Sequence, residues 1–309
     1  MINVPTQVVL TDTIGRAKSL RNILKNIMIQ VCAKFGGQPW GLKNLPMLDK
    51  PTMIIGIDVV HQVGKDKVSL VGFTATMDRY MAKYFVSSAT KANNSKPGKK
   101  KKRLVDITFE LEPLFQKAIL KFKETNKIAP QRIIIYRDSI SEGQNDIILR
   151  KEVPQLDQAI QKLKDNGVIT ESISYIYMVA NKKIEQRFCE KAQGEKLFNP
   201  KQGLVIEETI TRPDRFEFYL IPHTGPTGLQ CPMRYDVIKI EDWEGFNPKD
   251  LYDLTFNLSF GFFNYQNSIK LPGPLMYAHT LVNQVKKIVG NKQNCFVTPE
   301  NFEDKLYAI

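Results

Sequence analysis

The chain has few cysteines, and the four that it has lie far apart. Cys32, Cys189, Cys231 and Cys295 form no CxxC pair and have no histidine at metal-ligand spacing. This pattern excludes the common zinc motifs and a disulfide framework. Unpaired cysteines are typical of a reducing compartment, so we expect a cytoplasmic or nuclear protein.

Long hydrophobic runs are also missing. No stretch of about 18 uncharged apolar residues occurs, which excludes an evident membrane-spanning helix. The opening residues, MINVPTQVVL, lack the basic region followed by an apolar region that a signal peptide needs. We therefore expect a soluble chain that is not secreted.

Acidic residues are fewer than basic ones. The 309 residues include 44 Lys and Arg against 32 Asp and Glu, which gives a net charge of +12. Such an excess favours a polyanionic partner, either a nucleic acid or an acidic membrane surface. Charge alone does not choose between the two.

The first third of the chain combines one helical segment with short strands. Apolar residues at helical spacing predict a helix over residues 16–34, before Gly36 and Gly37. Three runs rich in β-forming residues then predict a meander, over residues 52–60, 67–77 and 80–87. The polar stretch 91–103 ends in five consecutive basic residues and predicts a surface loop. Contact with an RNA backbone and a nuclear-import signal are the alternatives for it.

Helices and strands alternate in the rest of the chain. The patterns predict helices over 105–126 and 155–166, strands over 132–136 and 169–179, and two late helices over 251–263 and 275–289. Alternation of this kind indicates the α/β class.

Two aspartates stand out because each belongs to a run that is otherwise apolar. Asp58 lies within the run 53–60, and Asp138 ends the run 133–138. A buried carboxylate needs a cation, a metal ion or hydrogen bonds, and the carboxyl ends of strands in α/β sheets are common ligand sites. Either aspartate alone is also consistent with a salt bridge or a turn cap. The pair favours a shared divalent ion of the kind that assists phosphodiester hydrolysis.

Four segments around these aspartates resemble the Piwi clade of the Argonaute family. They match in order and spacing, and the resemblance covers essentially the whole chain. The segments are MIIGIDVVH (53–61), RIIIYRDSISEGQ (132–144), NKKIEQRF (181–188) and LPGPLMYAH (271–279).

This resemblance implies a fold and a domain organisation. We expect an RNase H-like PIWI domain over residues 46–309, with a mixed central sheet flanked by helices. Residues 1–45 resemble the C-terminal part of a Rossmann-like MID domain. The PAZ and N-terminal domains of the family would precede residue 1, so the chain is expected to be a fragment or a shortened paralogue.

The resemblance also implies a metal-dependent nuclease site. Active members of the family use an Asp-Glu-Asp-His set around two Mg²⁺ ions, for which Mn²⁺ is an alternative. Asp58 and Asp138 match the two aspartates and His279 matches the histidine, so these three are the expected metal ligands. At the glutamate position the alignment places Asp106, one methylene shorter, while Glu110 matches by residue type. This departure puts cleavage in doubt.

The N-terminal segment resembles the family's pocket for the 5′ phosphate of the guide. Gln7, Gln30 and Lys34 match residues that hold the phosphate, and the apolar C-terminus that ends in Ile309 resembles the one that folds back toward that pocket. Lys34 alone would be read as a solvated lysine at a helix end.

The resemblance implies a small guide RNA and a complementary target RNA as partners, with silencing proteins as further candidates and no membrane partner. We therefore expect a gene-silencing module that cleaves its target with Mg²⁺. The first alternative is a guide-binding module that does not cleave and silences through recruited proteins. The second is a truncated chain that serves only as a surface for partner proteins.

Overall fold

The structure is a computed structural model of the chain. It describes residues 4–15, 19–63, 68–91, 110–138, 145–191, 197–223, 228–290 and 296–309. Asp106 and most of the predicted basic loop 91–103 lie outside these ranges.

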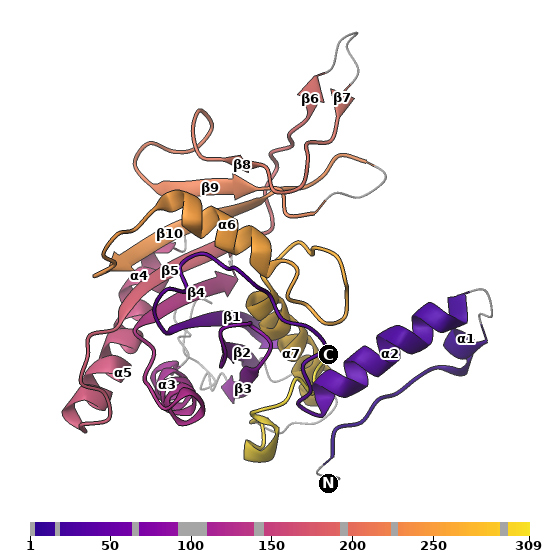
Figure 1. Ribbon diagram of the computed structural model, residues 1–309, viewed down its shortest axis with the longest axis horizontal. Coiled ribbons are helices and arrows are strands. Elements are labelled where there is room, and N and C mark those ends of the chain that lie inside the picture. Colours follow the sequence, from indigo (N-terminus) through magenta and orange to yellow (C-terminus); the bar gives the residue numbers. More distant parts are fainter. Residues whose placement is uncertain are drawn as a thin grey trace, which may run out of the picture.

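The described part of the chain is organised around one mixed sheet of eight strands (Figure 1). The strand order is β3-β2-β1-β4-β5-β10-β9-β8. The central pairs β1–β4 and β4–β5 are parallel, and the other neighbours are antiparallel. The strands are β1 Thr52–Val63, β2 Val68–Thr76, β3 Tyr84–Lys91, β4 Arg132–Asp138, β5 Ser174–Asn181, β8 Val205–Ile206, β9 Phe216–Leu220 and β10 Met233–Glu241.

Helices cover both faces of this sheet. One core cluster joins α3 and α5 to the odd-numbered residues of β1, such as Ile55 and Ile57. On the other face, α6 and α7 pack over even-numbered residues of the central strands, such as Ile54 and Tyr136. Alternation along each strand thus buries both faces, as expected for a sheet between two helical layers. The helices of the two layers are α3 Glu112–Asn126, α4 Asn145–Lys151, α5 Val153–Asp165, α6 Pro248–Leu258 and α7 Gly273–Gly290.

Three smaller parts lie outside these layers. Helices α1 Thr11–Ile14 and α2 Leu20–Lys34 stand beside the sheet, and the C-terminus comes close to the end of α2 (Figure 1). A two-stranded hairpin, β6 Glu190–Lys191 with β7 Leu197–Phe198, projects beyond β8 and β9 at the top of the view in Figure 1. A short 3-10 helix, Glu300–Phe302, precedes the C-terminus.

Most predicted elements are present, with shifted ends. The third strand of the meander begins at Tyr84 and not at residue 80, because the side chain of Asp78 accepts hydrogen bonds from the backbone amides of Ala82 and Lys83 and holds a turn there. Helix α3 begins at Glu112, so that Pro113 lies in its first turn. The backbone N–H that proline lacks would have no partner within the helix at that position, so its absence costs little. Helix α4 and strands β8 to β10 were not predicted.

Candidate functional site

Asp58 and Asp138 lie side by side at one edge of the sheet. Strands β1 and β4 are parallel, and their register runs up to the pair Ile57–Arg137, so the next residues along are the two aspartates. Neighbouring strands are about 4.8 Å apart, which brings the two carboxylates together on the face that α7 covers. Both are buried, with 3% of Asp58 and 5% of Asp138 exposed.

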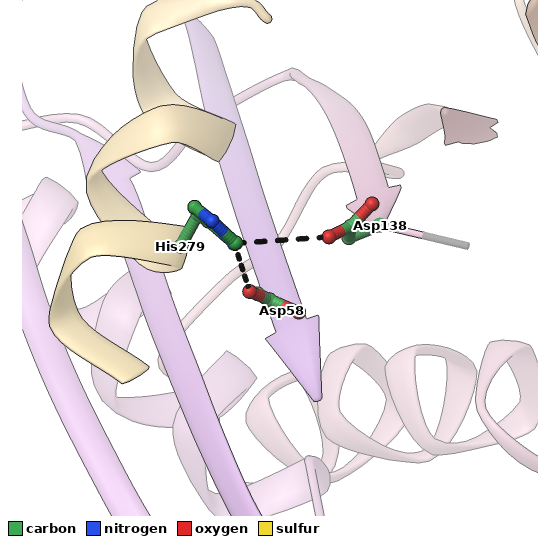
Figure 2. A group of neighbouring side chains, drawn as sticks. All are labelled: Asp58, Asp138 and His279. Carbon is green, nitrogen blue, oxygen red and sulfur yellow. Dashed lines mark hydrogen bonds and ion pairs between the residues drawn. The ribbon is translucent and has the colours of Figure 1, made fainter. Parts of the chain in front are cut away.

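His279 completes this group from helix α7 (Figure 2). Its Nδ1 atom lies 2.7 Å from Oδ2 of Asp58 and 3.9 Å from Oδ2 of Asp138. One ligand atom from each of the three residues lies within 4.8 Å of the others, and among the described residues this is the group of His, Cys, Asp and Glu that can hold a metal ion. The three expected metal ligands are therefore brought together.

Two glycines allow α7 to lie directly on the strands. A Cβ atom at Gly56 would be 2.4 Å from the carbonyl carbon and oxygen of Pro274. A Cβ atom at Gly72, the register partner of Asp58, would be 2.4 Å from the carbonyl oxygen of Ala278. Since Ala278 precedes His279, the absence of a side chain at residue 72 sets the depth at which the imidazole reaches Asp58.

The two carboxylates differ in their electrostatic surroundings. Burial by itself raises the pKa of Asp58, but the hydrogen bond and charge of His279, helped by Lys182 and Arg137, hold that pKa below its ordinary value. Burial and the neighbouring Asp58 raise the pKa of Asp138, and Lys182 and His279 only partly oppose this. Like charges this close disfavour double ionisation, which a divalent cation would relieve.

The donor set fits a hard divalent cation. Carboxylate oxygens suit Mg²⁺, and Mn²⁺ also accepts imidazole nitrogen. In addition, Oδ1 of Asp138 is buried and has no hydrogen-bond partner in the described part of the chain. A buried, unsatisfied carboxylate oxygen is costly unless a cation binds it.

Arg137 anchors the end of β4 from the opposite face of the sheet. Its guanidinium is almost fully buried and donates two hydrogen bonds of 2.9 Å to the carboxylate of Glu152, which lies between α4 and α5. It also donates to the backbone carbonyl of Asp138. The adjacent Glu152 carboxylate raises the pKa of Arg137, against the effect of burial. The guanidinium therefore stays charged and fixes the backbone that carries Asp138.

Two residues, Asp106 and Glu110, were predicted for the glutamate position of the site. Asp106 lies outside the described residues. Glu110 is exposed and is not part of the metal-capable group. Which of the two serves the site stays a prediction.

The four residues of the predicted phosphate pocket gather around the end of α2. Gln7 Nε2 donates to Oε1 of Gln30 at 3.2 Å, and Lys34 Nζ donates to the carbonyl oxygen of Thr6 at 3.1 Å. Ile309 packs on the apolar cluster that contains Ala33, the neighbour of Lys34. Lys34 is only 8% exposed, and this burial lowers its pKa. A solvated lysine is therefore the wrong interpretation, although phosphate binding stays a prediction.

Sequence reasoning missed Lys182, whose Nζ atom lies 2.5 Å from Oδ2 of Asp138. It is the first residue after β5, which pairs with β4 in parallel, so its position beside Asp138 follows from a strand pairing that the sequence does not reveal. The only available signal was its place in the segment 181–188.

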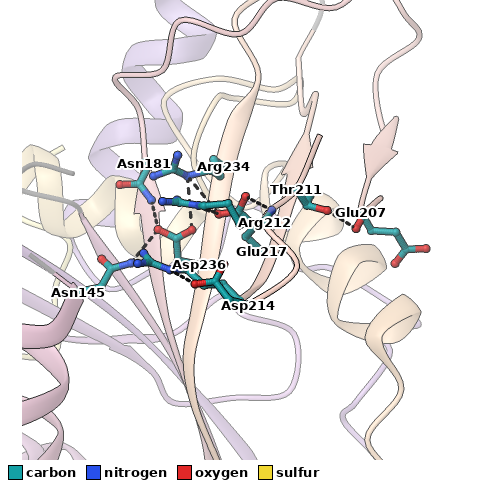
Figure 3. A network of polar contacts seen from close by, with 10 residues as sticks. Asn145, Asn181, Glu207, Thr211, Arg212, Asp214, Glu217, Arg234 and Asp236 are labelled. Atoms are coloured by element: carbon teal, nitrogen blue, oxygen red, sulfur yellow. Dashed lines mark hydrogen bonds and ion pairs between the residues drawn. The ribbon is translucent and has the colours of Figure 1, made fainter. Parts of the chain in front are cut away.

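A buried polar network at the same end of the sheet was also missed (Figure 3). Oδ2 of Asp236 accepts hydrogen bonds from Asn145 and Asn181, at 2.8 and 2.7 Å. Arg234 lies between Asp236 and Glu217, and Arg212 donates to Glu217 in turn. The network thus ties together the start of α4, the end of β5 and the start of β10.

Glu217→Gln should destabilise the fold in a pH-dependent way. Burial raises the pKa of Glu217, but Arg212 and Arg234 outweigh this and hold it below the ordinary 4.5. A depressed carboxyl pKa stabilises the fold above the unfolded-state value and stops doing so as pH falls through the folded-state value. Urea unfolding at neutral pH should show a loss of about 3 kcal/mol. The difference from wild type should shrink in acid, and a loss that is equal at both pH values would contradict this account.

No described helix is both long and apolar enough to cross a membrane.

Comparison with known proteins gives consistent matches. The family model described as "Piwi domain" matches residues 1–289. The chain is 32% identical over 279 residues to the Piwi-like protein Siwi of Bombyx mori, covering 90% of this chain and 29% of that protein. It is 28% identical over 305 residues to Piwi-like protein 1 of Danio rerio, covering 99% of this chain and 33% of that protein. The chain thus spans about a third of the length of these relatives.

Solved structures confirm the predicted fold class. The crystal structure of Drosophila Piwi matches with a TM-score of 0.79 at 27% identity, over 99% of this chain and 38% of that one. Kluyveromyces polysporus Argonaute with a guide RNA has the same TM-score at 19% identity, over 95% of this chain and 37% of that one, a likeness of fold alone. The mixed sheet between helical layers is the RNase H-like fold of these structures. The chain belongs to the Piwi domain family.

Proposed function

We propose that the chain is a guide-RNA-binding module that pairs its guide with a target RNA for gene silencing and cleaves the target with Mg²⁺. The observation that carries this proposal is the convergence of Asp58, Asp138 and His279 on one point of an RNase H-like sheet in a Piwi family chain. The net charge of +12 supports binding to phosphodiester backbones.

Each residue of the group has a role in this proposal. Asp58 and Asp138 would hold Mg²⁺ through carboxylate oxygens, and His279 would complete the set. The bound metal would supply a water of lowered pKa and stabilise charge on the phosphate oxygens. Arg137 keeps the backbone of Asp138 in place, and helix α7 covers the site on one side.

The identity of the fourth acidic ligand separates the two candidate functions. Asp106 is the proposed occupant of the glutamate position, with Glu110 as the alternative. A shorter carboxylate reaches less far toward the metals, so we expect slow cleavage or none. If the chain does not cleave, it would bind guide RNA and silence through recruited proteins. The Asp106 departure is the feature that favours this alternative function.

The proposed 5′-phosphate pocket comprises Gln7, Gln30, Lys34 and Ile309. Lys34 is buried, and its Nζ atom donates a hydrogen bond to the carbonyl oxygen of Thr6, which is a neutral acceptor. Oε1 of Gln7 is buried with no hydrogen-bond partner in the described part of the chain. A phosphate would give the ammonium an anionic partner and would explain why a lysine is kept buried there.

Lys34→Ala should therefore weaken the binding of guides that carry a 5′ phosphate more than that of guides with a 5′ hydroxyl. A charge-assisted hydrogen bond contributes about 1.5–3 kcal/mol, so the phosphate preference should fall by a factor of about 10 to 150. Filter binding or fluorescence anisotropy with the two guide types measures this preference directly.

Lys25→Ala is the matched control, because Lys25 is exposed on the same helix and the change removes the same charge. It should weaken both guides equally and slightly. An equal loss for both guides in Lys34→Ala would show that Lys34 has a structural role and would contradict the pocket.

A further inference from the structure

Lys182 is a charged residue at the site that the proposed chemistry does not use. Its ammonium lies 2.5 Å from Oδ2 of Asp138, and 27% of its side chain is exposed. The chain places it there through β5, since the register of β4 and β5 runs up to the pair Asp138–Ala180 and Lys182 follows two residues later. The contact therefore joins a partly exposed ammonium to a buried carboxylate.

The oxygen that Lys182 contacts is also the one that faces His279. Oδ2 of Asp138 lies 3.9 Å from Nδ1 of His279 and 2.5 Å from Nζ of Lys182. A divalent cation held by Asp138 and His279 would bind this carboxylate at about 2.0–2.2 Å for Mg²⁺ or Mn²⁺, through Oδ2 or the unsatisfied Oδ1, and would lie close to the ammonium in either case. Two cations this close repel each other, and a carboxylate that is already neutralised by an ammonium is a weaker ligand.

We propose that Lys182 competes with divalent cations for Asp138 and so sets the metal concentration at which the site fills. This inference rests on the proposed metal centre and deepens it. In the absence of a divalent ion, Lys182 compensates the charge of two adjacent carboxylates. Binding of the ion displaces the ammonium toward solvent, which its partial exposure permits.

The test is the affinity of the full chain for Mn²⁺, measured from the electron paramagnetic resonance signal of the free ion, without RNA. Lys182→Met should bind Mn²⁺ about tenfold more tightly than wild type, which corresponds to about 1.4 kcal/mol. Lys182→Arg should stay within about threefold of the wild-type affinity, because the positive charge that competes with the ion is kept. Lys183→Met removes a charge from the adjacent exposed residue and is the matched control, expected to leave the affinity unchanged.

An affinity in Lys182→Met that is equal to or weaker than that of wild type would overturn the competition. If Lys182→Met does not give folded protein, Lys182→Gln answers the same question. Asp58→Asn separates the two hypotheses. If Asp58→Asn abolishes Mn²⁺ binding and Lys182→Met leaves it unchanged, the competition alone is overturned. If Asp58→Asn leaves Mn²⁺ binding intact, the proposed metal centre and the competition are both overturned.

Discussion

Replacing Asp58 or Asp138 by asparagine is expected to abolish guided RNA cleavage. Each change keeps the shape of the side chain and removes the charge that would hold the metal. Loss of metal-assisted stabilisation of the transition state is a matter of several kcal/mol, so the rate should fall by at least about 10³-fold. Single-turnover cleavage of a labelled target in Mg²⁺, with the guide loaded beforehand, measures this loss.

Guide binding should survive both changes, because the proposed phosphate pocket lies at the end of α2 and uses other residues. Asp157→Asn is the control, since Asp157 is an exposed aspartate on α5 whose carboxylate accepts a hydrogen bond from Tyr175. Cleavage that persists in Asp58→Asn or Asp138→Asn would remove that aspartate from the metal site.

We expect the wild-type rate to depend on which residue occupies the glutamate position. If wild type cleaves too slowly to measure, the same comparison is made in an Asp106→Glu background, where we expect faster cleavage. Glu110→Ala should have little effect in either background, because Glu110 is exposed and lies outside the metal-capable group.

Much of the site could be predicted because its residues lie in distinctive local patterns. Asp58 and Asp138 interrupt apolar runs that predict strands, and such interruptions can be recognised in the sequence alone. His279 carried no such signal, and only the resemblance assigned it. The role of Lys182 could not be predicted from the sequence, because its contact with Asp138 depends on the parallel pairing of β4 with β5.

In the fold, too, elements with a local sequence pattern were predicted, and elements that depend on contacts between distant segments were missed. Helix α2 and strands β1 and β4 follow from periodicity and β-forming residues, which act locally. Strands β8 and β9 were missed because β8 has only two residues and β9 is apolar at four of its five positions. Strand β10 does alternate apolar and polar residues, but the alternation shifts between Val237 and Lys239. Arg234 and Asp236 of β10, with Glu217 of β9, are buried and charged, and they are tolerated because they pair with one another across the sheet. In the sequence these charges resemble a solvent-facing side of the strand, and their pairing across separate segments is not visible there.

The close approach of α7 to the sheet sets the geometry of the metal-capable group of Asp58, Asp138 and His279. Gly72 lies opposite Asp58 in β2, and the carbonyl of Ala278 occupies the space where a side chain would be. Gly56 has the same relation to Pro274 at the start of the helix. The hydroxyl of Thr74 donates to the carbonyl of Pro274 at 2.7 Å and holds this approach.

Gly72→Ala should therefore both destabilise the protein and disable the metal centre. The added methyl would lie 2.4 Å from the carbonyl oxygen of Ala278 and 2.7 Å from Cγ2 of Val282, so the helix backbone must shift. Overpacking of this kind costs about 3 kcal/mol, which lowers the melting temperature of a domain of this size by about 5 °C. Because His279 follows Ala278, its imidazole should move away from Asp58, and Mn²⁺ affinity should fall by at least about tenfold. Gly15→Ala adds the same methyl where the nearest atom is 3.6 Å away, and it should change neither quantity. A Gly72→Ala protein that melts like wild type and binds Mn²⁺ equally well would show that α7 can retreat without moving His279. In that case the glycine would not set the geometry of the site.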